Sequence, residues 1–105
     1  RTNSGGLVSV TQSSQAVPES FALYQNYPNP FNPSTKINFD IKNSTFASLK
    51  IFDMAGKEVQ TLITQNLLPG SYEITFNAGG INSGVYFYTL KTNEFTETKK
   101  MILVK

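Results

Sequence analysis

Hydrophobic and polar side chains alternate one by one along much of the chain. In residues 36–41, Ile37, Phe39 and Ile41 fall on one side of an extended backbone and the polar residues fall on the other. A repeat of two residues is typical of a strand with one buried and one solvated face. The same alternation predicts further strands over residues 47–52, 57–63 and 71–77.

The last third of the chain is more apolar. Residues 85–90 carry apolar side chains at nearly every position, which indicates a central strand covered on both faces. A final strand is expected over residues 95–104, and no window shows the 3.6-residue repeat of a helix. About seven short strands separated by turns predict an all-β antiparallel sandwich in one domain.

Turn residues separate the expected strands. Asp53 and Gly56 enclose one turn, in which Asp53 is expected to accept hydrogen bonds from backbone N–H groups and Gly56 to supply a positive φ. Gly70 follows a proline in a second turn, and a glycine-rich loop over residues 77–84 ends at Gly84. These residues are expected to set where the strands reverse.

Three prolines fall within residues 28–33, which we call the proline loop. Proline has no N–H for a sheet ladder, so this segment cannot be a central strand. Phe31 is expected to anchor the loop in the core, and the Tyr27–Pro28 bond is the best candidate for a cis peptide. The apolar residues 21–27 before the loop are expected to lie along a sheet edge.

Polar residues dominate the first part of the chain. They predict a flexible linker over residues 1–19 and a folded domain over residues 20–105. A short strand near residues 7–10 is the alternative within the linker. The chain does not begin with Met, so it is expected to be the C-terminal part of a longer protein whose cargo domain lies upstream.

The residue types exclude several classes of chemistry. The chain has 105 residues, a net charge of +2, and neither cysteine nor histidine. Disulfides, thiolate metal sites and thiol catalysis are therefore excluded. A small net charge without a dense basic stripe argues against nucleic acid as a partner. No apolar run approaches the roughly 20 residues of a membrane span, and Lys99 and Lys100 are expected to protect a solvated strand edge.

Asp53 and Glu58 are the best candidates for a pair of acids, because they flank one turn. Glycoside hydrolysis needs two carboxyl groups roughly 5–10 Å apart across a cleft, and Ca²⁺ needs about six or more oxygen ligands. The surrounding sequence supplies neither a cleft nor further acids. We therefore expect no catalytic residue, no metal site and no cofactor.

Tyr72, Tyr86 and Tyr88 leave two interpretations open. Either the rings line a surface that binds sugars, or they pack in the core with their hydroxyl groups at its rim. The alternation of the strands favours core packing, because a buried tyrosine usually finds a hydrogen-bond partner for its hydroxyl.

Five segments, taken in order, resemble the type A C-terminal sorting domain of the type IX secretion system. They are residues 23–35 (LYQNYPNPFNPST), 51–59 (IFDMAGKEV), 68–72 (LPGSY), 83–88 (SGVYFY) and 99–105 (KKMILVK). The resemblance extends over residues 21–105. A related Ig-like domain that caps flagellar hook assembly shares the Pro-Asn-Pro and Gly-Val-Tyr signatures.

The resemblance implies an Ig-like sandwich on a protein that is secreted or displayed at the surface of a Gram-negative bacterium of the Bacteroidetes group or a relative. It implies non-catalytic sorting by the outer-membrane translocon, cleavage by a surface sortase and anchoring of the cargo. The expected cleavage region is Ser14, Gln15, Ala16 and Val17. The expected recognition residues are Pro28, Asn29, Pro30, Phe31, Gly84, Tyr86, Lys99, Lys100, Met101, Ile102, Leu103, Val104 and Lys105.

A second function stays open at this stage: a carbohydrate-binding or structural Ig-like module of a secreted multidomain enzyme. In either case the terminal strand is expected to offer free N–H and C=O groups at a sheet edge, on which a partner strand can pair. The same edge would permit a weak homodimer.

Overall fold

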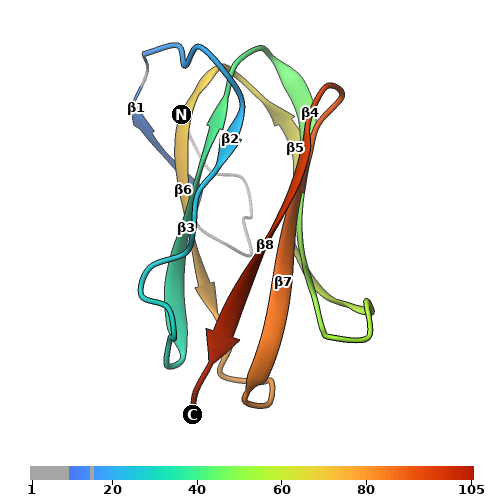
Figure 1. Cartoon of the computed structure of the whole chain (residues 1–105). Helices are drawn as coiled ribbons and strands as arrows, with labels where there is room; N and C mark the ends of the chain where they lie inside the picture. Colours follow the sequence, from blue (N-terminus) through green and yellow to red (C-terminus); the bar gives the residue numbers. More distant parts are fainter. Residues whose placement is uncertain (1–9, 15) are drawn as a thin grey trace.

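The computed structural model describes residues 10–14 and 16–105 (Figure 1). This part of the chain contains eight strands and no helix, so it holds no helix that is long and apolar enough to cross a membrane. The strands are β1 (Val10–Ser14), β2 (Ala22–Leu23), β3 (Ser34–Ile41), β4 (Thr45–Phe52), β5 (Glu58–Leu67), β6 (Gly70–Asn77), β7 (Gly84–Lys91) and β8 (Thr96–Leu103).

The strands form two sheets that face each other (Figure 1). Sheet A has the order β1-β6-β3-β2, and sheet B has the order β5-β4-β7-β8. Every pairing between these strands is antiparallel. The predicted all-β antiparallel sandwich is therefore confirmed, with one strand more than the seven expected.

The additional strand corrects one expectation about the linker. Val10–Ser14 is not a free tether, because as β1 it pairs with β6 from Ser71 to Ile74. The polar composition of this segment predicts a flexible linker. Pairing with a sheet edge, however, uses main-chain hydrogen bonds, which need no apolar side chains. Of the alternative strand at residues 7–10, only Val10 lies in β1; residues 7–9 lie outside the described residues. The boundary between residues 19 and 20 stays a prediction.

The core consists of the inward-facing residues of both sheets. Ile37, Phe39 and Ile41 are fully buried from sheet A, as the alternation predicted. The ring of Phe39 stacks on Tyr72 of the neighbouring strand, with centroids 5.4 Å apart. Burying side chains of this size stabilises the fold by about 1.5–3 kcal/mol each, which explains why the alternation decides the architecture.

The turn between β4 and β5 forms as expected. The Asp53 carboxylate accepts hydrogen bonds from the N–H groups of Ala55 (2.9 Å) and Lys57 (3.0 Å). Gly56 has a φ of +84°, which only glycine adopts without strain. Gly70 begins β6 directly after the β5–β6 turn and pairs with Ile41.

Candidate functional site

Most of the expected recognition residues converge at one end of the sandwich. This end, which we call the C-terminal pole, consists of the proline loop, the loop over residues 78–83 and the terminal residues 102–105. Figure 1 shows these three segments together at the end where β6 finishes and β7 begins. The first and the last of these segments are some seventy positions apart in the sequence, so only the fold brings them together.

The proline loop pairs with the end of β8. The Phe31 N–H donates to the Ile102 carbonyl, and the Val104 N–H donates to the Phe31 carbonyl, both at 2.9 Å. Phe31 and Leu103 form an isolated parallel bridge. The side chain of Asn29 adds a further bond by accepting the Ile102 N–H at 3.0 Å.

This pairing corrects the expectation that the terminal strand offers a free edge. At Ile102 and Val104 the outward backbone groups are already bonded to the proline loop. The Lys100 carbonyl accepts a hydrogen bond from the Gln25 side chain at 2.6 Å. The partner segment expected from outside is thus supplied by the chain itself, because unpaired edge groups are a liability that folds tend to cover.

Phe31 anchors the loop, as predicted. Its side chain is 1% exposed and its ring lies 6.0 Å from that of Phe76, measured between centroids. The Tyr27–Pro28 bond is cis, as are Asn29–Pro30 and Asn32–Pro33.

A buried polar network holds the start of the proline loop. The Asn26 side-chain amide donates to the Pro28 carbonyl (3.1 Å) and to the Thr35 hydroxyl (2.9 Å). The Thr35 hydroxyl also donates to the Pro28 carbonyl, at 2.8 Å. Asn26 and Thr35 are 2% and 1% exposed, so the bond between their side chains is shielded from water and the two bonds to Pro28 are partly shielded. A satisfied network of this kind fixes one conformation, because breaking it would leave buried polar groups without partners.

The Tyr88 hydroxyl joins this network to sheet B. It accepts the Asn26 N–H at 2.8 Å and donates to the Tyr24 carbonyl at 2.7 Å. Burial raises the pKa of Tyr88 to about 12, with a small further rise from the nearby Glu97 carboxylate, while the hydrogen bond from the Asn26 backbone works in the opposite direction. The hydroxyl therefore stays protonated and can donate at neutral pH.

The terminal residues close the pole from the other side. The Lys105 ammonium donates to the carbonyls of Gly79 (3.0 Å) and Ile81 (2.8 Å) in the loop over residues 78–83. The backbone N–H of Lys105 donates to the Ser83 hydroxyl at 3.0 Å. Gly84 follows this loop and pairs with Leu103 of β8.

The expected recognition residues divide into three groups by burial. Phe31, Tyr86, Met101 and Leu103 are buried and belong to the core. Gly84, Lys99 and Ile102 are partly exposed. The exposed residues are Pro28, Asn29, Pro30, Lys100, Val104 and Lys105. A partner can therefore touch the residues of the last two groups without unfolding the domain, but not those of the first.

Lys99 and Lys100 do not act as one charged edge. They alternate along β8, and Lys99 lies opposite the core residue Tyr88. Its ammonium pairs with the Glu97 carboxylate at 3.2 Å. Lys100 points to the solvated side opposite Phe87. The pair of lysines therefore splits between the two faces of sheet B.

Asp53 and Glu58 do not form a pair of acids. Asp53 caps its turn, while Glu58 accepts a hydrogen bond from the Thr61 hydroxyl and pairs with Lys50 at 3.6 Å. The Thr61 hydrogen bond, and after it the Lys50 charge, lower the pKa of Glu58, while slight desolvation raises it. Within residues 10–14 and 16–105, no three Asp, Glu, His or Cys side chains gather in a way that could hold a metal ion.

The three tyrosines that left two interpretations open pack in the core. The Tyr72 hydroxyl donates to the Leu68 carbonyl and the Tyr86 hydroxyl to the Asn82 carbonyl, both at 2.7 Å. In each case the acceptor lies four residues earlier in the chain, which resembles the tyrosine corner of immunoglobulin-like domains. Their rings are therefore not available as a sugar-binding surface.

The sequence analysis missed Asn26 and Gln25. Neither lies in a strand, and their partners Tyr88 and Lys100 are far away in the sequence, so no local pattern reveals them. Thr35 was detectable, because it occupies an inward position of the alternation that continues through Ile37 and Phe39.

Comparisons with known proteins agree with this geometry. The family model for the secretion system C-terminal sorting domain matches residues 25–105. No curated protein matches the chain. A solved structure of PorZ, a bacterial surface component of the type-IX secretion system of Porphyromonas gingivalis, is similar with 22% identity and a TM-score of 0.54. The match covers 79% of this chain and 11% of the PorZ chain, so it supports the sandwich fold alone.

The family match begins with Gln25 and ends with Lys105. These are the residues between which the structure builds the pole: Gln25 bonds to β8, and Lys105 bonds to the loop over residues 78–83. The matched segment thus contains the C-terminal pole and the strands β3 to β8. The chain belongs to the family of secretion system C-terminal sorting domains.

Proposed function

We propose that the type IX secretion machinery recognises this domain at its C-terminal pole. Domains of this family are sorting signals of type IX secretion and are not catalytic. The protein that carries such a domain is secreted or displayed at the cell surface of a Bacteroidetes-type bacterium. The proposal adds which surface is recognised, and it assigns no enzymatic activity to the domain.

The observation that carries the proposal is the convergence of distant segments on one rigid surface. Asn29 from the proline loop and Val104 and Lys105 from the terminal segment are exposed at this pole, and hydrogen bonds of their backbones or side chains fix their positions. A surface fixed in this way loses little conformational entropy on binding. It is therefore suited to recognition as a folded shape.

We further propose the outer-membrane translocon as the partner of the pole and a surface sortase as the partner of the segment before β2. Of the expected cleavage region, Ser14 is the last residue of β1, and Ala16 and Val17 lie between β1 and β2 with exposed side chains. Gln15 lies outside the described residues. Exposed connecting segments are preferred sites of proteolysis, which supports cleavage there.

The test compares two lysines at opposite ends of the sandwich in the full-length exported protein. Lys105→Ala removes a side chain of the C-terminal pole, whereas Lys42→Ala removes an exposed side chain from the β3–β4 turn at the other end. Both changes remove one positive charge. Asn29→Ala serves as a second variant at the pole.

We expect Lys105→Ala and Asn29→Ala to lower the amount of extracellular cargo, and Lys42→Ala to leave it unchanged. Thermal unfolding of each purified variant separates lost recognition from lost stability. A truncation of residues 101–105 is a poorer test, because it removes the core residues Met101 and Leu103. Normal export of both pole variants would overturn the proposal that this end is recognised.

A further inference from the structure

An open groove of about 620 Å³ lies on the outer face of sheet A. It runs along β3 between β6 and the segment that follows β2, outside the core and next to the proline loop. Its size falls in the range of sites that hold small molecules, roughly 300–1,000 Å³. The sorting function assigns no role to it.

Two tyrosines form one wall of the groove. Tyr24 is 47% exposed and Tyr27 is 81% exposed, although each ring has a large apolar area that burial would remove from water. Their backbones are fixed: the Tyr24 N–H donates to the Asn38 carbonyl, and Tyr27 and Lys36 exchange two hydrogen bonds, all at 3.0 Å. The ring of Tyr27 is therefore presented to solvent from a rigid position.

The upper part of the groove contains a carboxylate held in place. Asp40 accepts the Tyr24 hydroxyl at 2.6 Å with one oxygen and the Ser71 hydroxyl at 2.8 Å with the other. The Asp40 carboxylate raises the pKa of Tyr24, first through this hydrogen bond. A carboxylate has about four lone-pair positions, so Asp40 can accept further bonds from a ligand.

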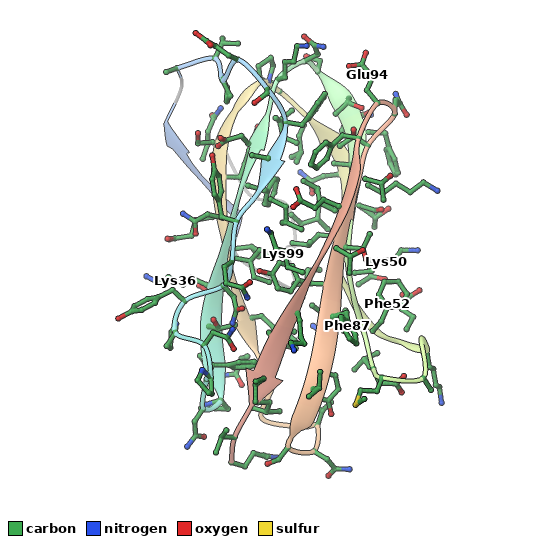
Figure 2. All side chains as sticks on the ribbon, viewed as in Figure 1. Lys36, Lys50, Phe52, Phe87, Glu94 and Lys99 are labelled. Atoms are coloured by element: carbon green, nitrogen blue, oxygen red, sulfur yellow. The ribbon has the colours of Figure 1, made fainter. Side chains whose placement is uncertain are left out.

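The floor of the groove combines donors with acceptors. The Nζ atom of Lys36 on β3 lies 3.9 Å from the Oε1 atom of Glu73 on β6. Lys36 is labelled in Figure 2. Asn38 lies directly opposite Glu73 and next to both Lys36 and Asp40 on the same face. The side-chain amide of Asn38 has no hydrogen-bond partner among the described residues, so its donor and its acceptor both remain free for a ligand.

The chemistry of the lining selects one class of ligand. One lysine against two carboxylates gives a net charge of −1, which repels phosphates and other polyanions. A lipid or an apolar side chain would remove these charged groups from water without adding hydrogen bonds to them, at a high cost in free energy. A sugar matches the lining, because its hydroxyl groups both donate and accept and its ring has an apolar C–H face.

We propose that this groove binds a saccharide. The C–H face of a sugar ring lies against Tyr27, and its hydroxyl groups bond to the Asn38 amide and to the carboxylates of Asp40 and Glu73. A sugar-binding surface on Tyr72, Tyr86 and Tyr88 was one interpretation of the sequence, but the rings of these residues lie in the core. The groove offers a different pair of tyrosines, and the proposal does not depend on the sorting function.

The test begins with the fluorescently labelled 105-residue chain on an array of bacterial, plant and animal glycans. The oligosaccharide retained best is then titrated calorimetrically into the wild type, Tyr27→Ala and Asn38→Ala. The control is Phe46→Ala, which removes an exposed aromatic side chain from sheet B on the opposite side of the sandwich. Both groove residues are exposed, and amide NMR spectra verify that each variant keeps the fold.

We expect the two groove variants to bind the oligosaccharide about tenfold more weakly or worse, and Phe46→Ala to bind as the wild type does. If the wild type retains no glycan on the array, the proposal is overturned. Equal affinity of Tyr27→Ala and the wild type would overturn it as well. Export of cargo by the groove variants is measured separately, so failure here leaves the sorting function untouched.

Discussion

At the scale of single residues, buried polar side chains determine how the C-terminal pole is held. The Tyr88 hydroxyl connects the Asn26 N–H to the Tyr24 carbonyl and is completely buried. Hydrophobic burial does not distinguish this arrangement from others, whereas the hydrogen bonds do, because each would be lost in a shifted loop.

We predict that high pH destabilises the protein through Tyr88. Its pKa is raised to about 12 in the folded state from the usual value of 10.0, so the folded state binds the proton more tightly. The resulting stability is fully present below pH 10 and is lost as the pH rises through about 12, by up to about 3 kcal/mol. Burial likewise raises the pKa of Tyr72, which adds a loss of the same sign.

The measurement is the urea midpoint of wild type and Tyr88→Phe between pH 8 and pH 12. At pH 8 we expect Tyr88→Phe to be less stable by about 1–3 kcal/mol, since two backbone groups lose their partner. Its stability should then fall less steeply with pH than that of the wild type. Parallel curves for the two proteins would show that Tyr88 does not titrate as described.

At the scale of elements, the turn between β4 and β5 rests on one glycine. We predict that Gly56→Ala lowers the free energy of unfolding by about 1–2 kcal/mol, because its φ of +84° is unfavourable for any residue with a Cβ atom. The matched control is Gly80→Ala, where an added Cβ meets nothing within 4 Å. Chemical denaturation of both variants checks this, and an equal effect at the two positions would contradict it.

The alternation predicted β3, β4, β6, β7 and β8 to within two residues at each end. It underestimated β5, which continues to Leu67, because the pairing with β4 shifts at Leu49–Lys50 and at Ile51–Phe52. These bulges place the adjacent residues Leu62 and Ile63 both in the core and interrupt the period of two. Prediction from the alternation assumes a regular ladder, so it missed the end of β5 after Ile63.

The candidate site was predictable only in part. The motifs named the segments that the fold brings together at the C-terminal pole, and the expected burial of Phe31 is observed. Whether Met101 or Val104 faces a partner depends on which side of β8 lies on the core. Whether the backbone groups of Ile102 are free depends on where the proline loop docks. Both are facts of tertiary structure that strand patterns do not contain.

At the scale of the whole molecule, β1 is the edge strand of sheet A that pairs with β6. The buried core begins at Leu23, and the family match begins at Gln25. We predict that a chain starting at residue 16 still unfolds in one cooperative transition, with stability lower by about 1–3 kcal/mol from the lost edge pairing. A chain starting at residue 10 is the control.

Removing β1 also uncovers the edge of β6 between Ser71 and Ile74. An uncovered edge favours association with other chains, so the shorter chain should show a larger mass in light scattering at high concentration. Weak dimerisation through an edge strand, expected at β8 from the sequence, therefore has its better position on sheet A. A shortened chain that is monomeric at all concentrations would argue against this position.

The docking of the proline loop on β8 has a consequence for synthesis and quality control. The loop comes early in the family-matched segment, and the strand that it needs comes last. During translation the proline loop cannot dock until the final residues, at the end of β8, have been synthesised. If the export machinery recognises this end, a prematurely terminated product lacks the recognised surface and stays in the cell, so only complete chains are exported.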